Sequence, residues 1–139
     1  GEIAGPRSVW QALDLLGAER IGHGIRAIED HALVDHLLAH RIPLEENLTS
    51  NLQTSCVPDY ASHPARAFME KGLCVTLNTD DPGISAIDLA YEYNIAAPAA
   101  GLTPGMIRQA QRNALEAAFL TAEEKQALVE KKRPPQSAG

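Results

Sequence analysis

The sequence predicts an α/β fold with parallel strands, because helical and strand-like segments alternate with short connections over residues 6–77. Three short apolar runs, at residues 20–24, 42–48 and 73–77, each follow a stretch in which apolar residues recur at helical spacing. Polar residues stand at or near the end of each run. Since the carboxyl ends of parallel strands meet at one edge of a sheet, that edge is where we expect a functional site.

The first predicted helix begins at Pro6, a favoured first helical residue, and stops at Gly17. The strand-like segment Arg20-Ile21-Gly22-His23-Gly24 follows it and places His23 at a strand exit. The flanking glycines let a ligand or another backbone segment approach closely. His23 is therefore a candidate functional residue, and a hydrogen-bonded structural histidine is the alternative interpretation.

A second helix is predicted from the capping residue Asp30, with Leu33, Val34, Leu37 and Leu38 on one apolar face. His36 and His40 are four residues apart, a spacing that makes them neighbours on a helix surface. No acidic residue lies between them, in contrast to the zinc-protease helix pattern, and His36 is on the polar side. We therefore do not expect them to bind a metal.

Residues 42–48 read as a second strand that carries Glu45 and Glu46. Adjacent residues of a strand face opposite sides, so one glutamate can point into a core while the other points outward; two solvated acids are an equal alternative. Residues 52–62 lack periodicity and are predicted to form a loop, and a short helix is predicted from Pro64 to Gly72.

The third strand, Leu73 to Leu77, leads into Asp80-Asp81-Pro82-Gly83. Two neighbouring carboxylates repel each other when both are ionised, so burial would require hydrogen-bond donors or a cation, and a metal ion is one natural partner. The alternative is a solvated turn in which the acids only cap the next helix.

Three further helices are predicted downstream, over residues 87–97, from Thr103-Pro104, and from Thr121, where Thr121 and Glu124 form a capping box. Residues 134–139 read as a frayed tail. The chain shows no internal repeat and no low-complexity linker, so we predict one domain.

Composition narrows the functional classes. The chain has 139 residues, a formal net charge of -6 and a sequence pI near 5.3, which argues against nucleic acid as a partner. Its apolar runs are too short to span a bilayer, and no secretory signal opens it. With only two cysteines, Cys56 and Cys74, a reducing cytoplasmic location is expected. Oligomeric state is left open.

Four segments are informative when taken together: Arg20-Ile21-Gly22-His23-Gly24, Thr49-Ser50-Asn51, Leu77-Asn78-Thr79-Asp80-Asp81-Pro82-Gly83 and Ala96-Ala97-Pro98-Ala99-Ala100-Gly101-Leu102. In combination they resemble the adenosine deaminase family, the metal-dependent adenosine/AMP deaminases. The resemblance covers nearly the whole chain. It implies the second half of a (β/α)₈ TIM-type barrel, strands 5 to 8 with their helices, plus C-terminal helices. Residues 1–139 would be the C-terminal part of a single catalytic domain.

The same resemblance implies roles for individual residues. Gly1-Glu2 resembles the end of a His-Ala-Gly-Glu motif, so Glu2 would be the proton donor. Asp80 would ligate one Zn²⁺, His23 would steer the attacking water, and Asp81 would accept a hydrogen bond from the purine. Asn47 replaces a cysteine that is usual in the family, and the remaining zinc histidines are missing. The chain therefore looks truncated at its start, and alone it is expected to be inactive.

The implied reaction is the zinc-dependent hydrolytic deamination of adenosine and 2'-deoxyadenosine to inosine and 2'-deoxyinosine, with release of ammonia, as in purine salvage. One alternative is a related deaminase acting on another 6-aminopurine, such as adenine or a modified nucleoside. The other is a non-catalytic half-barrel that binds or assembles with another chain.

Overall fold

The computed structural model describes residues 3–131. Within this range three parallel strands form one sheet in the order β1-β2-β3: β1 is Ile21–Gly22, β2 is Leu44–Glu46 and β3 is Val75–Leu77. Gly22 pairs with Glu45, and Glu45 with Thr76, so the three strands end at the same edge. The predicted α/β architecture with parallel strands is confirmed.

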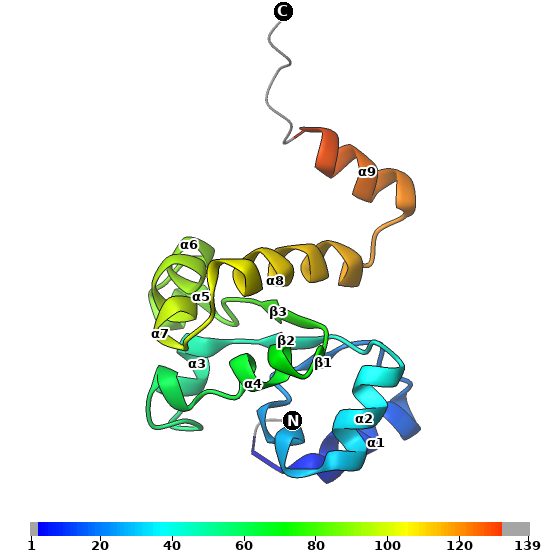
Figure 1. The fold of residues 1–139 in the computed structure, drawn as a ribbon, viewed down its shortest axis with the longest axis vertical. Helices are drawn as coiled ribbons and strands as arrows, with labels where there is room; N and C mark the ends of the chain where they lie inside the picture. The colour runs from blue at the N-terminus through cyan, green and yellow to red at the C-terminus, as the bar shows by residue number, and fades with distance from the viewer. Residues whose placement is uncertain (1–2, 132–139) are drawn as a thin grey trace, which may run out of the picture.

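Helices surround this sheet (Figure 1). In chain order they are α1 Pro6–Leu16, the 3₁₀ helix η1 Ile25–Glu29, α2 His31–Ala39, α3 Leu48–Gln53, the 3₁₀ helix η2 Tyr60–Ser62, α4 Ala65–Glu70, α5 Pro82–Ser85, α6 Leu89–Tyr91, the π-helix η3 Glu92–Ala96, α7 Ala97–Ala99, α8 Pro104–Ala117 and α9 Ala122–Lys131. None of the helices in residues 3–131 combines the length and apolarity needed to cross a membrane.

Several helix ends follow the local signals in the sequence. Pro6 opens α1, and Gly17 caps it in the left-handed conformation with φ 60°. The Asp30 carboxylate accepts the Leu33 N–H at 3.1 Å at the start of α2. The Thr121–Glu124 capping box forms in both directions before α9, with bonds of 2.8 and 3.2 Å. Capping supplies partners for amides that a helix leaves unbonded, which is why these ends were predictable.

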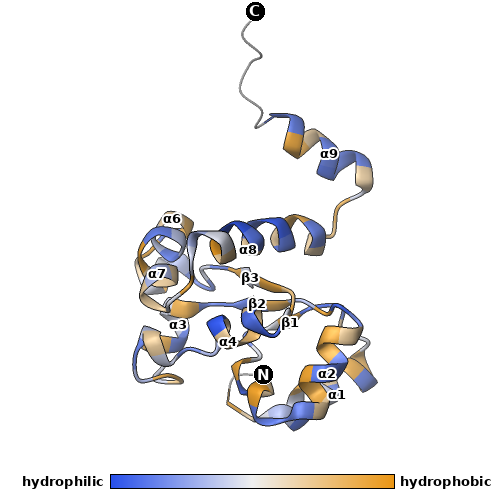
Figure 2. Cartoon of the chain, viewed as in Figure 1, coloured by the Kyte–Doolittle hydropathy of each residue, from blue (hydrophilic) through white to orange (hydrophobic). Residues whose placement is uncertain are grey.

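Two apolar clusters hold the elements together. The first packs α1, α2 and α4 against the sheet and includes Leu37, Leu44 and Phe68, none of which is exposed to solvent. The second packs α3, α7 and α8 around Leu48 and Leu77. Complete burial of a Leu or Phe side chain stabilises a fold by about 1.5–3 kcal/mol. Both α1 and α2 carry hydrophobic and hydrophilic residues on the same helix, as amphipathic helices do (Figure 2).

One buried polar side chain fastens α8 to the sheet. Asn113 is 2% exposed, and its Nδ2 donates to the main-chain oxygen of Val75 at 2.8 Å. Its Oδ1 accepts a 2.8 Å hydrogen bond from Gln109 one turn earlier. A buried carbonyl is costly without a partner, so Asn113 aligns the helix with β3.

The structure corrects several predicted boundaries. The second strand is shorter than predicted, and α3 occupies residues 48–53, part of which was predicted as strand or loop. The Glu92 carboxylate accepts the Thr49 N–H at 3.1 Å and so caps α3 from a distant part of the chain. Leu38, predicted on the apolar face of α2, is 41% exposed. The predicted tail at residues 134–139 lies outside the described residues.

Candidate active site

His23 and Asp80 meet at the carboxyl edge of the sheet. His23 follows β1 and Asp80 follows β3, and the His23 Nε2 atom is 3.5 Å from Asp80 Oδ2. Both residues have φ 60°, in the left-handed region that residues other than glycine rarely adopt. Such conformations cost of order 1–3 kcal/mol each and persist where the surrounding structure over-determines them. The prediction that both residues reach a common rim is confirmed.

The Asp80 carboxylate is held from the side by Ser50. Ser50, in α3, donates its hydroxyl to Asp80 Oδ2 at 2.6 Å. The Asp80 side chain is nevertheless 43% exposed to solvent. A carboxylate that is both oriented and accessible is suited to bind a cation or a polar ligand.

A chain of side-chain hydrogen bonds extends behind His23. Its Nδ1 is 3.1 Å from Asn51 Nδ2, and Asn51 Oδ1 is 3.1 Å from His63 Nε2. The Ala65 N–H donates to His63 Nδ1, also at 3.1 Å. Burial, assisted by nearby His23, lowers the pKa of His63 to about 4. His63 is therefore a neutral imidazole near pH 7.

The two strand glutamates take opposite sides, as the alternation of strand residues requires. Glu45 lies at the site and forms an ion pair with Arg20, with 3.2 Å between Arg20 Nε and Glu45 Oε1. Glu46 is completely buried, and this burial raises its pKa well above the ordinary value. Neither of its oxygens has a hydrogen-bond partner among the described residues, although Oε2 is 3.7 Å from His63 Nε2.

A cleft of about 460 Å³ opens above the strand ends. It is lined by Gly22, His23, Glu45, Asn47, Asn78, Thr79, Asp80 and Leu89. Most of these side chains are polar, so the cleft suits a small polar molecule. Asp81 is exposed and caps α5, accepting the Ile84 N–H at 3.1 Å, so the predicted capping role of this turn is confirmed. Glu2 lies outside the described residues.

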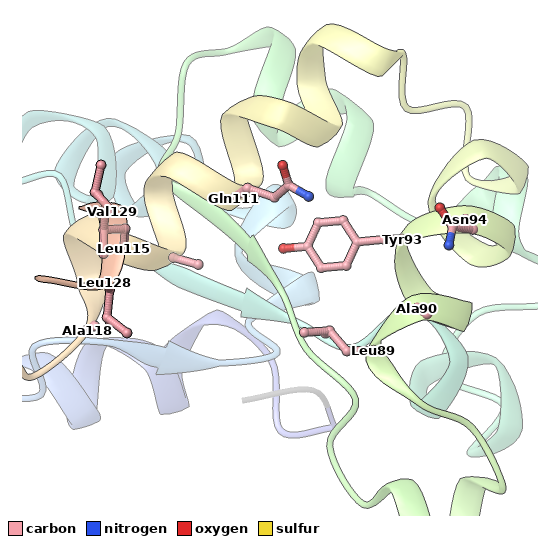
Figure 3. Close-up of a pocket in the computed structure, with 10 residues that line it drawn as sticks. Leu89, Ala90, Tyr93, Asn94, Gln111, Leu115, Ala118, Leu128 and Val129 are labelled. Carbon is pink, nitrogen blue, oxygen red and sulfur yellow. The ribbon is translucent and has the colours of Figure 1, made fainter. Parts of the chain in front are cut away.

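A second cavity of about 740 Å³ is unsuited to binding a cation or a small polar molecule. Figure 3 shows its lining, formed by Leu89, Ala90, Tyr93, Asn94, Gln111, Ala114, Leu115, Ala118, Leu128 and Val129. These residues come from α6, η3, α8 and α9, with Ala118 directly after α8, and include no histidine, cysteine or carboxylate. The smaller, polar cleft is therefore the candidate active site.

Within residues 3–131, no group of three or more His, Cys, Asp and Glu side chains is arranged to hold a metal ion. His23 and Asp80 nevertheless bring together two of the donor types that zinc prefers, an imidazole and a carboxylate.

The His36 and His40 rings stack at 4.1 Å between centroids, and His40 Nδ1 is 2.9 Å from the His36 carbonyl oxygen. These two histidines therefore contact each other at the end of α2.

The sequence alone assigned no role to Ser50, Asn51 or His63. Ser50 and Asn51 belong to the Thr49-Ser50-Asn51 segment that contributes to the family resemblance, which was a usable signal. His63 stands next to a stretch predicted to be a loop and carries no pattern of its own. Its position became visible only through its contacts with Asn51 and Ala65.

Known proteins are similar to this chain in sequence and in fold. A family model described as "Adenosine deaminase" matches residues 1–133. Adenosine deaminase from Escherichia coli O1:K1 / APEC is 60% identical over 131 residues, which are 94% of this chain and 39% of that protein. The adenosine deaminase of Escherichia coli O139:H28 (strain E24377A / ETEC) is 59% identical over 131 residues, again 94% of this chain and 39% of that protein. The chain thus spans only 39% of the length of these curated relatives.

Solved structures of related deaminases have a fold similar to that of this chain. Adenine deaminase from Arthrobacter aurescens superimposes with a TM-score of 0.88 at 28% identity, covering 94% of this chain and 40% of that one. The apo N6-methyl-AMP deaminase from Arabidopsis thaliana gives a TM-score of 0.76 at 31% identity, covering 94% and 38%. With a family model that matches nearly its whole length, this chain belongs to the adenosine deaminase family.

Proposed function

We propose that the protein carrying this chain catalyses the hydrolytic deamination of adenosine and 2'-deoxyadenosine to inosine and 2'-deoxyinosine, with release of ammonia. One observation supports the proposal above all. In this chain, which belongs to the adenosine deaminase family, His23 Nε2 lies 3.5 Å from Asp80 Oδ2 at the carboxyl ends of the strands. Residues 1–139 would form the C-terminal part of a single catalytic domain, the second half of a (β/α)₈ barrel. A cytoplasmic role in purine salvage fits this reaction.

Zinc is the proposed cofactor, and the donors in the cleft fit it. Asp80 would be the ligand, since its carboxylate is exposed to the cleft and oriented by Ser50. A zinc site takes about four ligands, so the others would come from outside residues 3–131. When bound, zinc lowers the pKa of a coordinated water to about 7.

The remaining steps belong to side chains of this chain. His23 would hold the attacking water by a hydrogen bond from Nε2, the atom that faces the cleft beside Asp80. Glu2 would protonate the purine ring nitrogen next to the carbon that bears the amino group, which makes that carbon electrophilic. Asp81, exposed beside Asp80, would accept a hydrogen bond from the purine. The oxygen of water would add to this carbon and the carbon–amino bond would break; of the two water protons, one would restore Glu2 and the other would leave with the amino group as ammonia.

A second candidate is deamination of another 6-aminopurine. The solved structures that resemble this chain include an adenine deaminase and an N6-methyl-AMP deaminase. All three substrates present a purine carbon bearing an amino or substituted amino group. Their discrimination depends on contacts to the sugar and phosphate, and much of that surface would be formed outside this chain.

The test is adenosine turnover, followed by the fall in ultraviolet absorbance, in the protein that carries this chain. Asp80→Ala should abolish turnover, whereas Asp59→Ala, which removes an exposed capping carboxylate, should leave it intact. Adenine and N6-methyl-AMP serve as competing substrates. Turnover that survives in Asp80→Ala would overturn the proposal. A folded protein that binds zinc and deaminates none of the three would indicate a binding or assembly role.

The role of Asp81 needs a separate measurement. In the active protein Asp81→Ala should raise KM for adenosine more than it lowers kcat, because the contact is made to the bound purine. An unchanged KM with an intact fold would reduce Asp81 to the helix-capping role observed with Ile84.

A further inference from the structure

The hydrogen-bond chain behind His23 begins at a donor whose direction is fixed. A backbone amide can only donate, and the Ala65 N–H points at His63 Nδ1 at 3.1 Å. His63 Nδ1 must therefore be the unprotonated, accepting nitrogen. His63 is 3% exposed, and the lowered pKa keeps its ring neutral, so its proton is on Nε2.

The direction then passes through Asn51. The His63 Nε2–H needs an acceptor, and the Asn51 side chain lies 3.1 Å away, so its oxygen rather than its nitrogen must face His63. The Asn51 Nδ2 is then turned toward His23 Nδ1, also at 3.1 Å. Asn51 is fully buried, which favours one orientation of its amide over the reversed one.

Glu46 does not reverse this order. Its Oε2 is 3.7 Å from His63 Nε2, farther than Asn51 Oδ1. An ionised Glu46 carboxylate would accept from the same Nε2–H and so support the same tautomer of His63. Burial favours its neutral form, which leaves the Asn51 oxygen as the nearer acceptor.

We propose that His63 and Asn51 are positioning residues that make His23 Nδ1 a hydrogen-bond acceptor and so place the ring proton of His23 on Nε2. Because Asn51 Nδ2 donates to His23 Nδ1, the proton of His23 is directed into the cleft, toward Asp80 Oδ2. There it can donate to an oxygen of Asp80, of water or of substrate. The catalytic consequence rests on the proposed deamination, whereas the proton position does not.

The proton position can be read directly by long-range ¹H–¹⁵N NMR of the histidine rings, which distinguishes Nε2–H from Nδ1–H tautomers. The wild-type protein should show His23 protonated on Nε2. Asn51→Asp keeps the shape and the acceptor for His63 but replaces the donor to His23 with an oxygen. The His23 proton should therefore move to Nδ1. A wild-type Nδ1–H signal, or an unmoved proton in Asn51→Asp, would overturn the proposal.

Two variants of His63 provide a test that does not depend on Asn51→Asp folding. His63→Gln retains a side-chain N–H for Asn51 Oδ1 and should keep the His23 proton on Nε2. His63→Leu removes the N–H that orients the Asn51 oxygen and should give a mixture of the two His23 tautomers. Identical His23 signals in both variants would contradict the proposal that His63, acting through Asn51, sets the position of the His23 proton. His31→Gln, an exposed site on α2, serves as the control.

Turnover in the same samples separates the two proposals. Asn51→Asp should lower kcat for adenosine by about 10- to 100-fold with little change in KM, since it alters the proton position and not the purine contacts. His63→Gln should retain more activity than His63→Leu. If wild-type protein shows the Nε2–H tautomer but no deamination, the positioning role of His63 and Asn51 stands and the proposed function fails. If wild-type protein deaminates adenosine but the proton does not move in Asn51→Asp, the proposed function stands and the positioning role fails.

Discussion

Gly24→Ala should destabilise the fold because Gly24 is both left-handed and tightly packed. Its φ is 71°, and a Cβ at this position would lie 2.8 Å from Leu44 Cδ2 and 3.2 Å from Ile21 Cγ2. Leu44 is completely buried and Ile21 is 5% exposed, so the Leu44 side chain would have to shift within the packed core to admit the methyl group. The same backbone carries the adjacent His23 into the cleft.

Two costs, one of backbone conformation and one of packing, determine how much Gly24→Ala lowers the free energy of unfolding. A left-handed conformation costs an L-residue about 1–2 kcal/mol, and overpacking a filled core typically costs about 1–3 kcal/mol. Gly24→Ala should therefore lower the free energy of unfolding by about 2–5 kcal/mol. Gly17→Ala is the matched control, because Gly17 has φ 60° and its added Cβ meets no described atom within 4 Å. Only the backbone term of about 1–2 kcal/mol should apply there.

Urea unfolding followed by circular dichroism gives both free energies. The difference between Gly24→Ala and Gly17→Ala isolates the contact with Leu44 and Ile21. Adding Leu44→Val to Gly24→Ala should recover part of the loss, because the shorter side chain makes room for the methyl group. Equal losses in the two glycine variants, within about 0.5 kcal/mol, would refute the packing argument.

Three further predictions concern buried polar groups. Asn113→Ala should lower the free energy of unfolding by about 1–3 kcal/mol in urea titrations, because the buried Val75 carbonyl loses its partner. His63 has its pKa lowered from 6.5 to about 4 in the folded state, so below pH 6.5 the unfolded state binds a proton that the native state does not. The contribution of His63 to stability should therefore fall by roughly 3 kcal/mol as pH falls from 6.5 to 4, and the difference in the free energy of unfolding between wild type and His63→Gln should change by this amount. Glu46 has a raised pKa, so its native state favours the protonated form, and wild-type stability relative to Glu46→Gln should fall as pH rises above 4.5. A stability difference between these two proteins that does not vary with pH would contradict the burial argument for Glu46.

Local signals in the sequence were enough for much of the fold. Pro6 and Gly17 predicted both ends of α1, and the Thr121–Glu124 capping box predicted the start of α9. These signals work because capping and left-handed turns involve atoms only a few residues apart. Parallel strand order then predicted that His23 and Asp80 would reach the same edge, and their side chains are 3.5 Å apart.

Contacts between distant residues decided the rest. The N-terminus of α3 is capped by Glu92, 43 residues away from Thr49, so no local pattern marked this helix. Strand alternation required Glu45 and Glu46 to face opposite sides, but only the folded chain, which places His63 3.7 Å from Glu46, decided that Glu46 is the buried one. The chain from His63 through Asn51 to His23 joins three segments, and its direction depends on the amide of Ala65. The sequence by itself determined which residues stand at the strand ends. Only the tertiary structure decided how they are oriented, because the side chains that orient them come from other segments.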